Sequence, residues 1–281
     1  MGEPFVGSEA VARGELLKSA LRTRYTRVFR DIYVSPGTEL TPEIRARAAW
    51  LWSRRRGIIA GKSASALYGA KWVDAAAPLE LIHSNRNPLA GLKVRTEQID
   101  EDEVVRIAGL PVTSLARTAL DIGSWYQRDE AVAALDALAG ATDLKSADVD
   151  LLMQRYARRR GIEQARTALG LMDGGAQSPK ETWLRLIIID DGMPRPQTQI
   201  PVFDGPGDPF AFVDMGWEDI KVGVEYDGEQ HRLNDWQYRW DLRRADRLQR
   251  RRWINVRVTA GDRQGEILRR VRAARACRLS R

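Results

Sequence analysis

The fold of the second half of the chain is decided by the stretch Val222-Gly-Val-Glu225-Tyr-Asp227-Gly-Glu-Gln-His231. Side chains alternate between the two faces of a β-strand, so the valines and Tyr226 fall on one face while Glu225 and Asp227 share the other. Two carboxylates placed so close together repel each other unless a cation joins them. At a phosphate site that cation is typically Mg²⁺, held by one or two carboxylates and waters.

The residues around this stretch predict the order of elements in the second half. A helix is expected from Ser178-Pro-Lys-Glu181 to Gly192, because serine caps helices and proline suits the first helical position. Alternating apolar residues then predict strands at residues 197–203, 211–216 and 220–226, a basic helix at 234–251, a strand at 253–258 and a closing helix. The predicted order is α-β-β-β-α-β-α, with Asp214 near the end of the strand that precedes Glu225.

This order of elements and acids resembles the PD-(D/E)XK nuclease superfamily, which has a restriction-endonuclease-like core. Within it, nearly all of residues 178–260 resemble the very-short-patch-repair-endonuclease-like branch, through Val213-Asp214, Val224-Glu-Tyr-Asp-Gly228, His231, Asp241-Leu-Arg-Arg244, Leu248 and Trp253-Ile-Asn-Val-Arg-Val258. The resemblance implies Mg²⁺ as cofactor, with Mn²⁺ as an alternative. It also implies Asp214 and Glu225 as metal ligands, Asp227 as a further or water-mediated ligand, Glu181 in orienting a metal-bound water, and His231 as base or transition-state donor.

The same resemblance implies that Arg243, Arg244 and Arg247 hold the neighbouring phosphates. The alternative for these arginines is a solvated helix face. Where the superfamily has lysine two residues after the second acid, this chain has Asp227, which cannot activate water or stabilise charge as lysine does. The very-short-patch-like branch commonly carries this acid-x-acid form, and Lys180 and Lys221 are candidates for the missing cation.

The first half of the chain begins with the outline of a winged helix. Two short helices are expected between Ser8 and Thr23, followed by strand-like alternation from Tyr25 to Val34 that stops at Ser35-Pro36-Gly37. The second helix and the wing carry the candidate DNA-binding residues Lys18, Arg22, Arg24, Arg27 and Arg30, where contacts to phosphates are made in such folds. The alternative is a structural cap with a charged surface.

The rest of the first half predicts an α+β module followed by helices. A helix is expected from Thr41-Pro42-Glu43 to about Arg56, a short helix at 63–69, strands at 79–83 and 92–96, and three or four helices between Ser114 and Met172. The stretch 173–179 contains two glycines and a proline, and it interrupts the periodic spacing of apolar residues expected of helices and strands. We therefore predict an α/β protein with domains at 1–172 (winged-helix-like 1–37, α+β and helical 38–172) and 173–281.

Residues 5–125 resemble the AbiEi-type antitoxin family of abortive-infection systems. The resemblance lies in Asp31-Ile-Tyr-Val34, Ala64-Ser-Ala-Leu-Tyr-Gly69 and Gly109-Leu-Pro-Val-Thr-Ser-Leu-Ala-Arg-Thr-Ala-Leu-Asp121, in that order. It implies a winged helix that binds promoter DNA and a following domain that contributes to binding a cognate protein partner. The winged helix is abbreviated here.

Composition narrows the classes of function. The chain has 281 residues, 43% of them hydrophobic, and a single cysteine, which fits a folded protein in a reducing compartment such as the cytoplasm. No apolar stretch approaches the ~20 residues of a membrane span, and the N-terminus lacks a signal-peptide pattern, so we expect no membrane association. Residues 173–238 hold 5 basic and 13 acidic residues, whereas 239–281 hold 15 basic and 4 acidic. An acidic region beside a basic one suits a nucleic-acid enzyme.

The leading hypothesis is therefore a metal-dependent DNA endonuclease or nickase that hydrolyses phosphodiester bonds, in a defence, toxin–antitoxin or repair context. The alternative is a non-catalytic DNA-binding regulator or antitoxin with a degenerate nuclease domain. RNA cleavage is a third hypothesis, since it uses the same metal chemistry. Hydrolysis requires that three sequence-distant carboxyl groups, including those of Asp214 and Glu225, converge around a cavity able to hold magnesium. If their oxygens are splayed apart, or plugged by an arginine salt bridge, hydrolysis should be abandoned.

Overall fold

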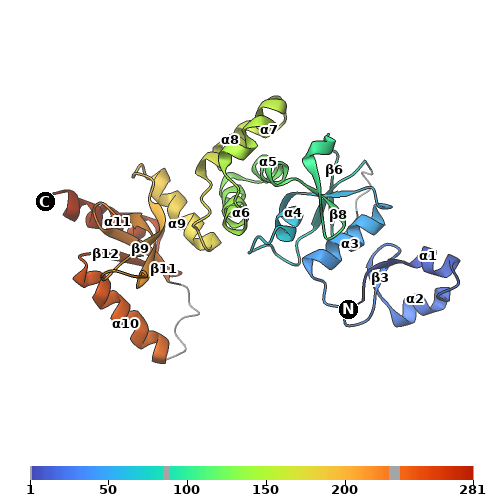
Figure 1. The fold of residues 1–281 in the computed structure, drawn as a ribbon, viewed down its shortest axis with the longest axis horizontal. Helices are drawn as coiled ribbons and strands as arrows, with labels where there is room; N and C mark the ends of the chain where they lie inside the picture. Colours follow the sequence, from blue (N-terminus) through green and yellow to red (C-terminus); the bar gives the residue numbers. More distant parts are fainter. Residues whose placement is uncertain (1, 85–88, 228–234, 281) are drawn as a thin grey trace. The chain divides into compact units, whose positions relative to one another are not determined.

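The computed structural model describes residues 2–84, 89–227 and 235–280, with the backbone alone over 235–242. The chain divides into two compact units, Met1–Met172 and Asp173–Arg281, which we treat separately (Figure 1). Helices and mixed sheets confirm the predicted α/β class. In the described residues no helix is both long and apolar enough to cross a membrane.

The start of the first unit has the predicted outline of two helices and a hairpin. It comprises β1 (Phe5–Val6), α1 (Gly7–Ala12), α2 (Lys18–Arg24), β2 (Thr26–Phe29) and β3 (Ile32–Val34), with the sheet order β1-β3-β2. The short β1 was not predicted. Asp31 in the hairpin turn accepts a hydrogen bond from the backbone N–H of Ser8 at 2.9 Å, which ties the turn to the start of α1. Phe29 and Ile32 pack with α3 residues in one core.

A five-stranded sheet forms the middle of the first unit. Its order is β6-β5-β4-β8-β7, and its strands are β4 (Ile58–Ile59), β5 (Leu79–Ile82), β6 (Leu92–Arg95), β7 (Val104–Ile107) and β8 (Leu110–Thr113). The sequence predicted β5 and β6 but not β4, β7 and β8. The helices α3 (Pro42–Trp52) and α4 (Gly61–Leu67) accompany it. The helix α3 ends before the predicted Arg56, since Arg54 and Arg55 adopt left-handed φ angles of 56° and 63°.

Four helices complete the first unit: α5 (Leu115–Trp125), α6 (Arg128–Ala141), α7 (Asp150–Arg155) and α8 (Ile162–Leu171). They surround a buried ionic network that the sequence did not predict. The fully buried Arg117 donates to Asp121 at 2.9 Å and to Glu103, and Arg159 donates to the same oxygen of Asp121 at 2.7 Å. Buried charges of this kind persist in proteins when they are paired.

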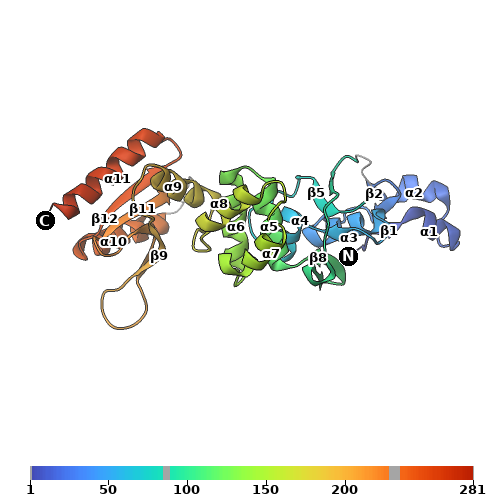
Figure 2. The same ribbon diagram turned by 90° about the horizontal axis from the view of Figure 1, so that it is seen from above.

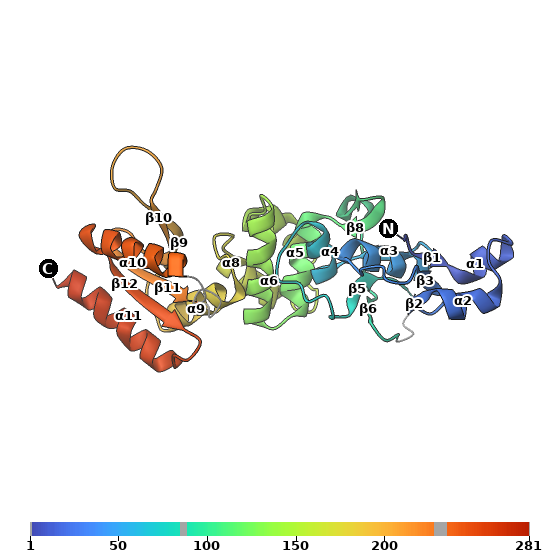
Figure 3. The ribbon, with the colours of Figure 1, turned by 90° about the horizontal axis from the view of Figure 1, so that it is seen from below.

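The second unit has the predicted order of elements. They are α9 (Pro179–Asp190), β9 (Gln197–Val202), β10 (Ala211–Trp217), β11 (Val222–Asp227), α10 (Asp235–Arg250), β12 (Ile254–Thr259) and α11 (Gln264–Leu279). The sheet order is β12-β11-β10-β9, in which β11 and β12 are parallel and the other neighbours antiparallel. Figures 2 and 3 show the loop between β9 and β10 projecting from this sheet.

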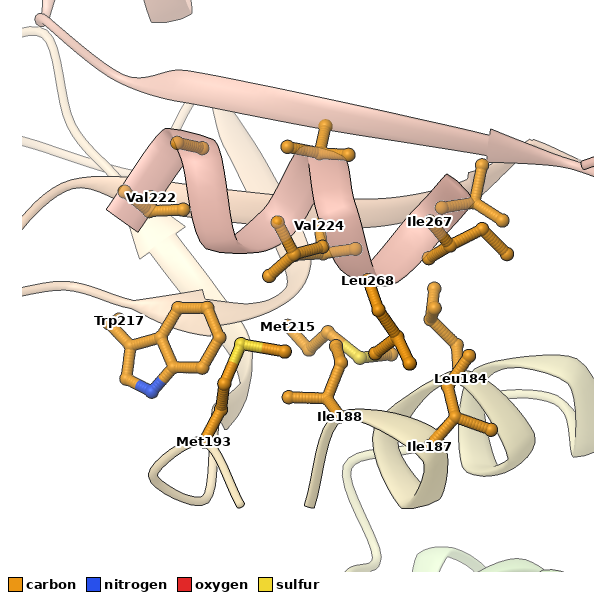
Figure 4. Packing of buried hydrophobic residues seen from close by; sticks show 14 residues of the cluster. Leu184, Ile187, Ile188, Met193, Met215, Trp217, Val222, Val224, Ile267 and Leu268 are labelled. Carbon is orange, nitrogen blue, oxygen red and sulfur yellow. The ribbon is translucent and has the colours of Figure 1, made fainter. Parts of the chain in front are cut away.

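Both faces of this sheet are covered by helices. Val222 and Val224 lie in a core with Met215, to which α9 contributes Leu184 and α11 contributes Ile267, as the strand alternation predicted (Figure 4). A smaller core on the α10 side contains Val213, Leu248 and Trp253. Figure 3 shows α10 and α11 on opposite sides of the sheet.

Candidate functional site

Asp214 on β10 and Glu225 on β11 are neighbours across two paired strands. The antiparallel register joins Met215 to Val224, so the residue before Met215 falls beside the residue after Val224. The backbone N–H of Tyr226 donates to Oδ2 of Asp214 at 3.1 Å. The structure therefore brings together the two residues that were predicted to be the principal acids.

The environment of Asp214 is unfavourable for a negative charge. Burial, followed by the negative charges of Glu225 and Glu181, raises the pKa of Asp214 to about 7 from an ordinary value of 3.8, while the Tyr226 N–H and Arg244 act in the opposite direction. Three predicted acids, from α9, β10 and β11, are thus close enough to influence one another. A carboxyl group whose neighbours are other carboxylates is typical of sites that bind a cation or a proton.

Glu225 is already neutralised by an arginine. Its carboxylate is 7% exposed and accepts hydrogen bonds from both Nη atoms of Arg244, at 3.0 Å from Nη1. The Arg244 guanidinium also donates to the carbonyl of Phe212. From β12, Nδ2 of Asn255 donates to Oε2 of Glu225 at 2.5 Å. Arg244 therefore forms an arginine salt bridge at Glu225, whereas Asp214 forms no ion pair within the described residues, and the phosphate-binding role of Arg244 stays a prediction.

Glu181 serves as a helix cap. The Ser178 hydroxyl donates to Oε1 of Glu181 at 2.9 Å and the backbone N–H of Gln177 donates to Oε2 at 2.9 Å. In return the N–H of Glu181 donates to the Ser178 hydroxyl at 3.2 Å. Ser178 is thus the N-cap of α9, and the Glu181 carboxylate reaches back to the residue before the cap, which fixes the start of the helix. Both oxygens of Glu181 are therefore engaged by the chain itself, although its charge still acts on Asp214.

The two remaining predicted catalytic residues are less closely tied to this pair. Asp227 is half-buried at the end of β11, where its Cα is paired with Thr259. His231 lies outside the described residues. Over the described ranges, no set of three acids that includes Asp214 or Glu225 has its oxygens within 4.8 Å of one another.

A tight acidic group does occur in the first unit, at Asp100, Asp102 and Glu103. One oxygen from each residue lies within 4.8 Å of the others, a spacing that could hold a metal ion. Nη1 of Arg155 is 3.4, 3.0 and 2.7 Å from oxygens of these three residues, in that order. The guanidinium thus already occupies the position of a cation, and it lowers the pKa of Asp102.

The basic residues predicted to bind DNA differ in their availability. The side chains of Lys18, Arg22, Arg24, Arg27 and Arg30 are all exposed, and none forms an ion pair with a carboxylate of the described residues. In the second unit Arg243 is exposed too. Arg247, however, forms an ion pair with Asp204 and lies 4.0 Å from the ring centre of Phe210, so it is tied to the β9–β10 loop.

Within the described residues, neither of the two lysines proposed to replace the missing cation forms an ion pair with Asp214 or Glu225. Lys221 precedes β11, at the opposite end of the strand from Asp227, and its Nζ donates to the carbonyl of Arg251 at 3.3 Å. Lys180 is exposed in the first turn of α9. The cation at Glu225 is instead Arg244 from α10.

The sequence did not predict Asn255 as part of the site. Asn255 is the first of three polar residues that alternate with Ile254, Val256 and Val258 along β12, and the parallel register pairs it with Gly223. A Cβ at Gly223 would lie 3.1 Å from Oδ1 of Asn255 and 2.7 Å from Val213, so glycine allows this close approach. The available signal was the alternation of β12, which places Asn255 on the face of the sheet opposite Val256 and Val258.

Comparison with known proteins gives relatives but no family. No family model matches the sequence. No solved structure matches it. Two uncharacterized proteins of Mycobacterium tuberculosis, from strains CDC 1551 and H37Rv, are each 28% identical over 237 residues, which is 84% of this chain and 86% of the relative. Because 237 exceeds the length of the first unit, Met1–Met172, the similarity extends into both units.

Proposed function

We propose that the protein is a metal-dependent nuclease that binds DNA through its first unit and hydrolyses phosphodiester bonds with its second. The observation that carries this proposal is the meeting of Asp214 and Glu225 on adjacent paired strands, where the charges of Glu225 and Glu181 add to burial in raising the pKa of Asp214. Acids from separate elements converge where the predicted order of elements expects them. The exposed cations from Lys18 to Arg30 support DNA binding, since phosphate contacts supply most of the non-specific affinity of proteins for DNA.

Asp214 and Glu225 fit a divalent ion of the Mg²⁺ type. They supply carboxylate oxygens from adjacent strands, and Mg²⁺ is usually bound by one or two carboxylates with waters in the remaining positions. Mg²⁺, or Mn²⁺ in its place, would supply charge to stabilise the phosphate under attack. Asp227 is half-buried two residues beyond Glu225 and is a further candidate ligand. Glu181 would act through its charge and through the position of α9, rather than as a ligand.

A second candidate function is a DNA-binding regulator whose nuclease-like unit has no activity. The specific observation that favours it is the bidentate pairing of Arg244 with Glu225, which satisfies one of the two acids without a metal. The similarity of the first half to AbiEi-type antitoxins supports the same alternative and a cognate protein partner. For either function we propose a cytoplasmic location, in line with the single cysteine.

The two functions are separated by incubating the full chain with supercoiled plasmid and Mg²⁺ or Mn²⁺. The nuclease predicts nicked or linear products that disappear in Asp214→Asn and Glu225→Gln and persist in Asp208→Asn, a matched change in the exposed β9–β10 loop. Structured and single-stranded RNA in parallel reactions would reveal an RNase.

Binding without cleavage would favour the regulator. In that case a gel-shift assay should show DNA affinity that falls when Arg22, Arg24 and Arg27 are replaced by glutamine. The slope of log affinity against log salt should become shallower by about one for each lost phosphate contact. Cleavage that survives Asp214→Asn would show that another site, or a contaminating enzyme, is responsible.

A further inference from the structure

A cavity of about 720 Å³ lies in the second unit beside β12, the outermost strand of its sheet. Its walls come from the second half of α10, from β12 and from the last turn of α11, and Figure 3 shows β12 between these two helices. The volume falls in the range of pockets that bind small organic ligands. Neither the acidic site nor the winged-helix-like start includes this cavity.

The charge around the cavity has one sign. Arg252, Arg257 and Arg278 line it, and no aspartate or glutamate does. Within the described residues none of the three forms an ion pair with a carboxylate, whereas nearby Arg247 and Arg251 both pair with Asp204. Three guanidinium groups around one space repel one another, and an anion bound between them would relieve that repulsion.

One of the three arginines, Arg278, is held in place by the chain. Nη2 of Arg278 donates to the backbone carbonyl of Arg252, which joins the end of α11 to the end of α10 across the cavity. Arg252 itself has a left-handed φ of 64°, so the chain turns sharply between α10 and β12. Positioned guanidinium groups bind phosphate through paired N–H···O bonds, which gives them specificity for phosphate over a simple point charge.

Part of the remaining wall is apolar, beside the polar side chains of Gln249 and Asn255. Leu248 and Trp253 contribute buried side chains, and Ile254 is partly buried. A small inorganic anion would leave this wall in contact with water, while a phosphate attached to a larger organic group would cover it. A phosphate monoester carries close to two negative charges at neutral pH, and this matches three arginines better than a single carboxylate does.

We propose that this cavity binds the phosphate monoester of a nucleotide, either a free nucleoside monophosphate or the phosphorylated end of a DNA strand. The arginines hold the phosphate and the apolar wall receives the nucleoside. One wall residue, Asn255, also donates to Glu225, so the cavity and the acidic site are one side chain apart. Binding here does not require that the acidic site hydrolyse anything.

Cys277 provides a direct probe, because it lines the cavity, is exposed and is the single cysteine of the chain. The full chain is reacted with N-ethylmaleimide, an uncharged reagent, and labelling is followed by intact mass. Thymidine monophosphate, thymidine, and a short oligothymidylate with or without a 5′-phosphate are added separately. A bound ligand should slow labelling about tenfold at ten times its dissociation constant, because only the empty cavity exposes the thiol.

Protection by thymidine monophosphate identifies a free nucleotide as ligand, and protection by the 5′-phosphorylated oligonucleotide alone identifies a strand end. The double variant Arg257→Gln/Arg278→Gln should lose the protection, while the matched Arg250→Gln, an exposed arginine of α10 outside the cavity, should keep it. Equal protection by thymidine, equal protection by the unphosphorylated oligonucleotide, or no protection by any ligand would overturn the proposal. These results are independent of plasmid nicking, so the two proposals can fail separately.

Discussion

The two units each contain a cluster of buried carboxylates and arginines, but the balance of charge differs. In the first unit Asp121 contacts the guanidinium groups of both Arg117 and Arg159. Burial raises the pKa of Asp121, and both arginines oppose the rise. In the second unit the neighbours that act on Asp214 are mainly other carboxylates, and they add to the effect of burial.

This difference separates a structural cluster from a candidate functional one. Where each acid contacts a guanidinium, the network is close to neutral and its loss should cost stability. Where acids face acids, the folded state is less stable than it would be with neutral side chains, and such a cost is typical of sites that bind or react. The second cluster shares one feature with the first, because Glu225 is paired with the guanidinium group of Arg244. Asp214 has no such pair within the described residues.

The largest loss of folding stability is expected from Arg117→Met in the first unit. Removing this guanidinium leaves Glu103 and Asp121 buried with one fewer partner, and breaking a buried ion pair in this way costs about 3–5 kcal/mol. Urea denaturation of the full chain should show the loss, and hydrogen exchange of peptides from α5 should place it in the first unit.

A matched control for Arg117 is Arg166→Met on α8, whose ion pair with Glu163 is exposed. An exposed pair contributes only about 0–1 kcal/mol, so this variant should be close to the parent. Equal losses from the two variants would mean that the buried network is not the source of stability, and the contrast between the units would no longer hold.

The variant Asp214→Asn is expected to stabilise the fold, in contrast to Arg117→Met. Because the pKa of Asp214 is about 7 in the folded state and its ordinary value is 3.8, ionisation costs stability progressively as the pH rises from about 4 to 7. The variant should therefore be more stable than the parent by about 1–3 kcal/mol at pH 8, since water partly screens a half-buried group, and the gain should vanish near pH 4. Melting temperatures across this pH range test the prediction.

Asp208→Asn makes the same change of charge at an exposed position of the β9–β10 loop. It should change stability by less than about 0.5 kcal/mol and without this dependence on pH. If Asp214→Asn behaves like Asp208→Asn, then Asp214 is not crowded by the other carboxylates, and the main support for a metal site is lost.

The variant Arg244→Gln tests whether Arg244 competes with a divalent metal ion for Glu225, because it removes the guanidinium that pairs with this acid. We expect Mn²⁺ to bind about tenfold more tightly to this variant, seen as a larger rise in melting temperature at a given Mn²⁺ concentration. Arg243→Gln, its exposed neighbour on α10, is the control. Weaker Mn²⁺ binding in Arg244→Gln would indicate that the arginine supports the site rather than closing it.

The elements that could be predicted are those with strong local signals. The order of helices and strands after Ser178 followed from caps and alternating apolar residues, and the meeting of Asp214 with Glu225 followed from the pairing of their strands. The strand β4 was missed because two residues carry too little periodicity, and β8 was missed because Pro111 within it argues against a strand. The strand β7 is as long as the predicted β5 and β6, so its length does not explain why it was missed.

The partners of the acids could not be predicted from spacing in sequence. Arg244 lies on a helix that reaches Glu225 only through tertiary packing, and Asn255 arrives from the parallel strand β12. The ionic network at Arg117 likewise brings Arg159, from the turn before α8, and Glu103, from the turn before β7, to the local pair Arg117–Asp121 on α5. Long-range contacts between charged residues leave no periodic pattern in a single sequence.

The smallest changes in stability are expected from variants of Glu181, which acts both in the cap of α9 and as a source of negative charge. Two variants separate these roles. Glu181→Gln keeps one acceptor oxygen for the cap and removes the charge that raises the pKa of Asp214, so the relief at Asp214 should offset the lost hydrogen bond and leave stability at pH 8 within a few tenths of a kcal/mol of the parent. Glu181→Ala loses the cap as well and should cost about 0.5–1 kcal/mol. Melting temperatures of both variants at pH 8 and pH 4 provide the measurement. Equal losses of stability in the two variants would mean that the charge of Glu181 does not affect the ionisation of Asp214. If the parent nicks plasmid and Glu181→Gln abolishes the nicking, Glu181 has a role beyond the cap.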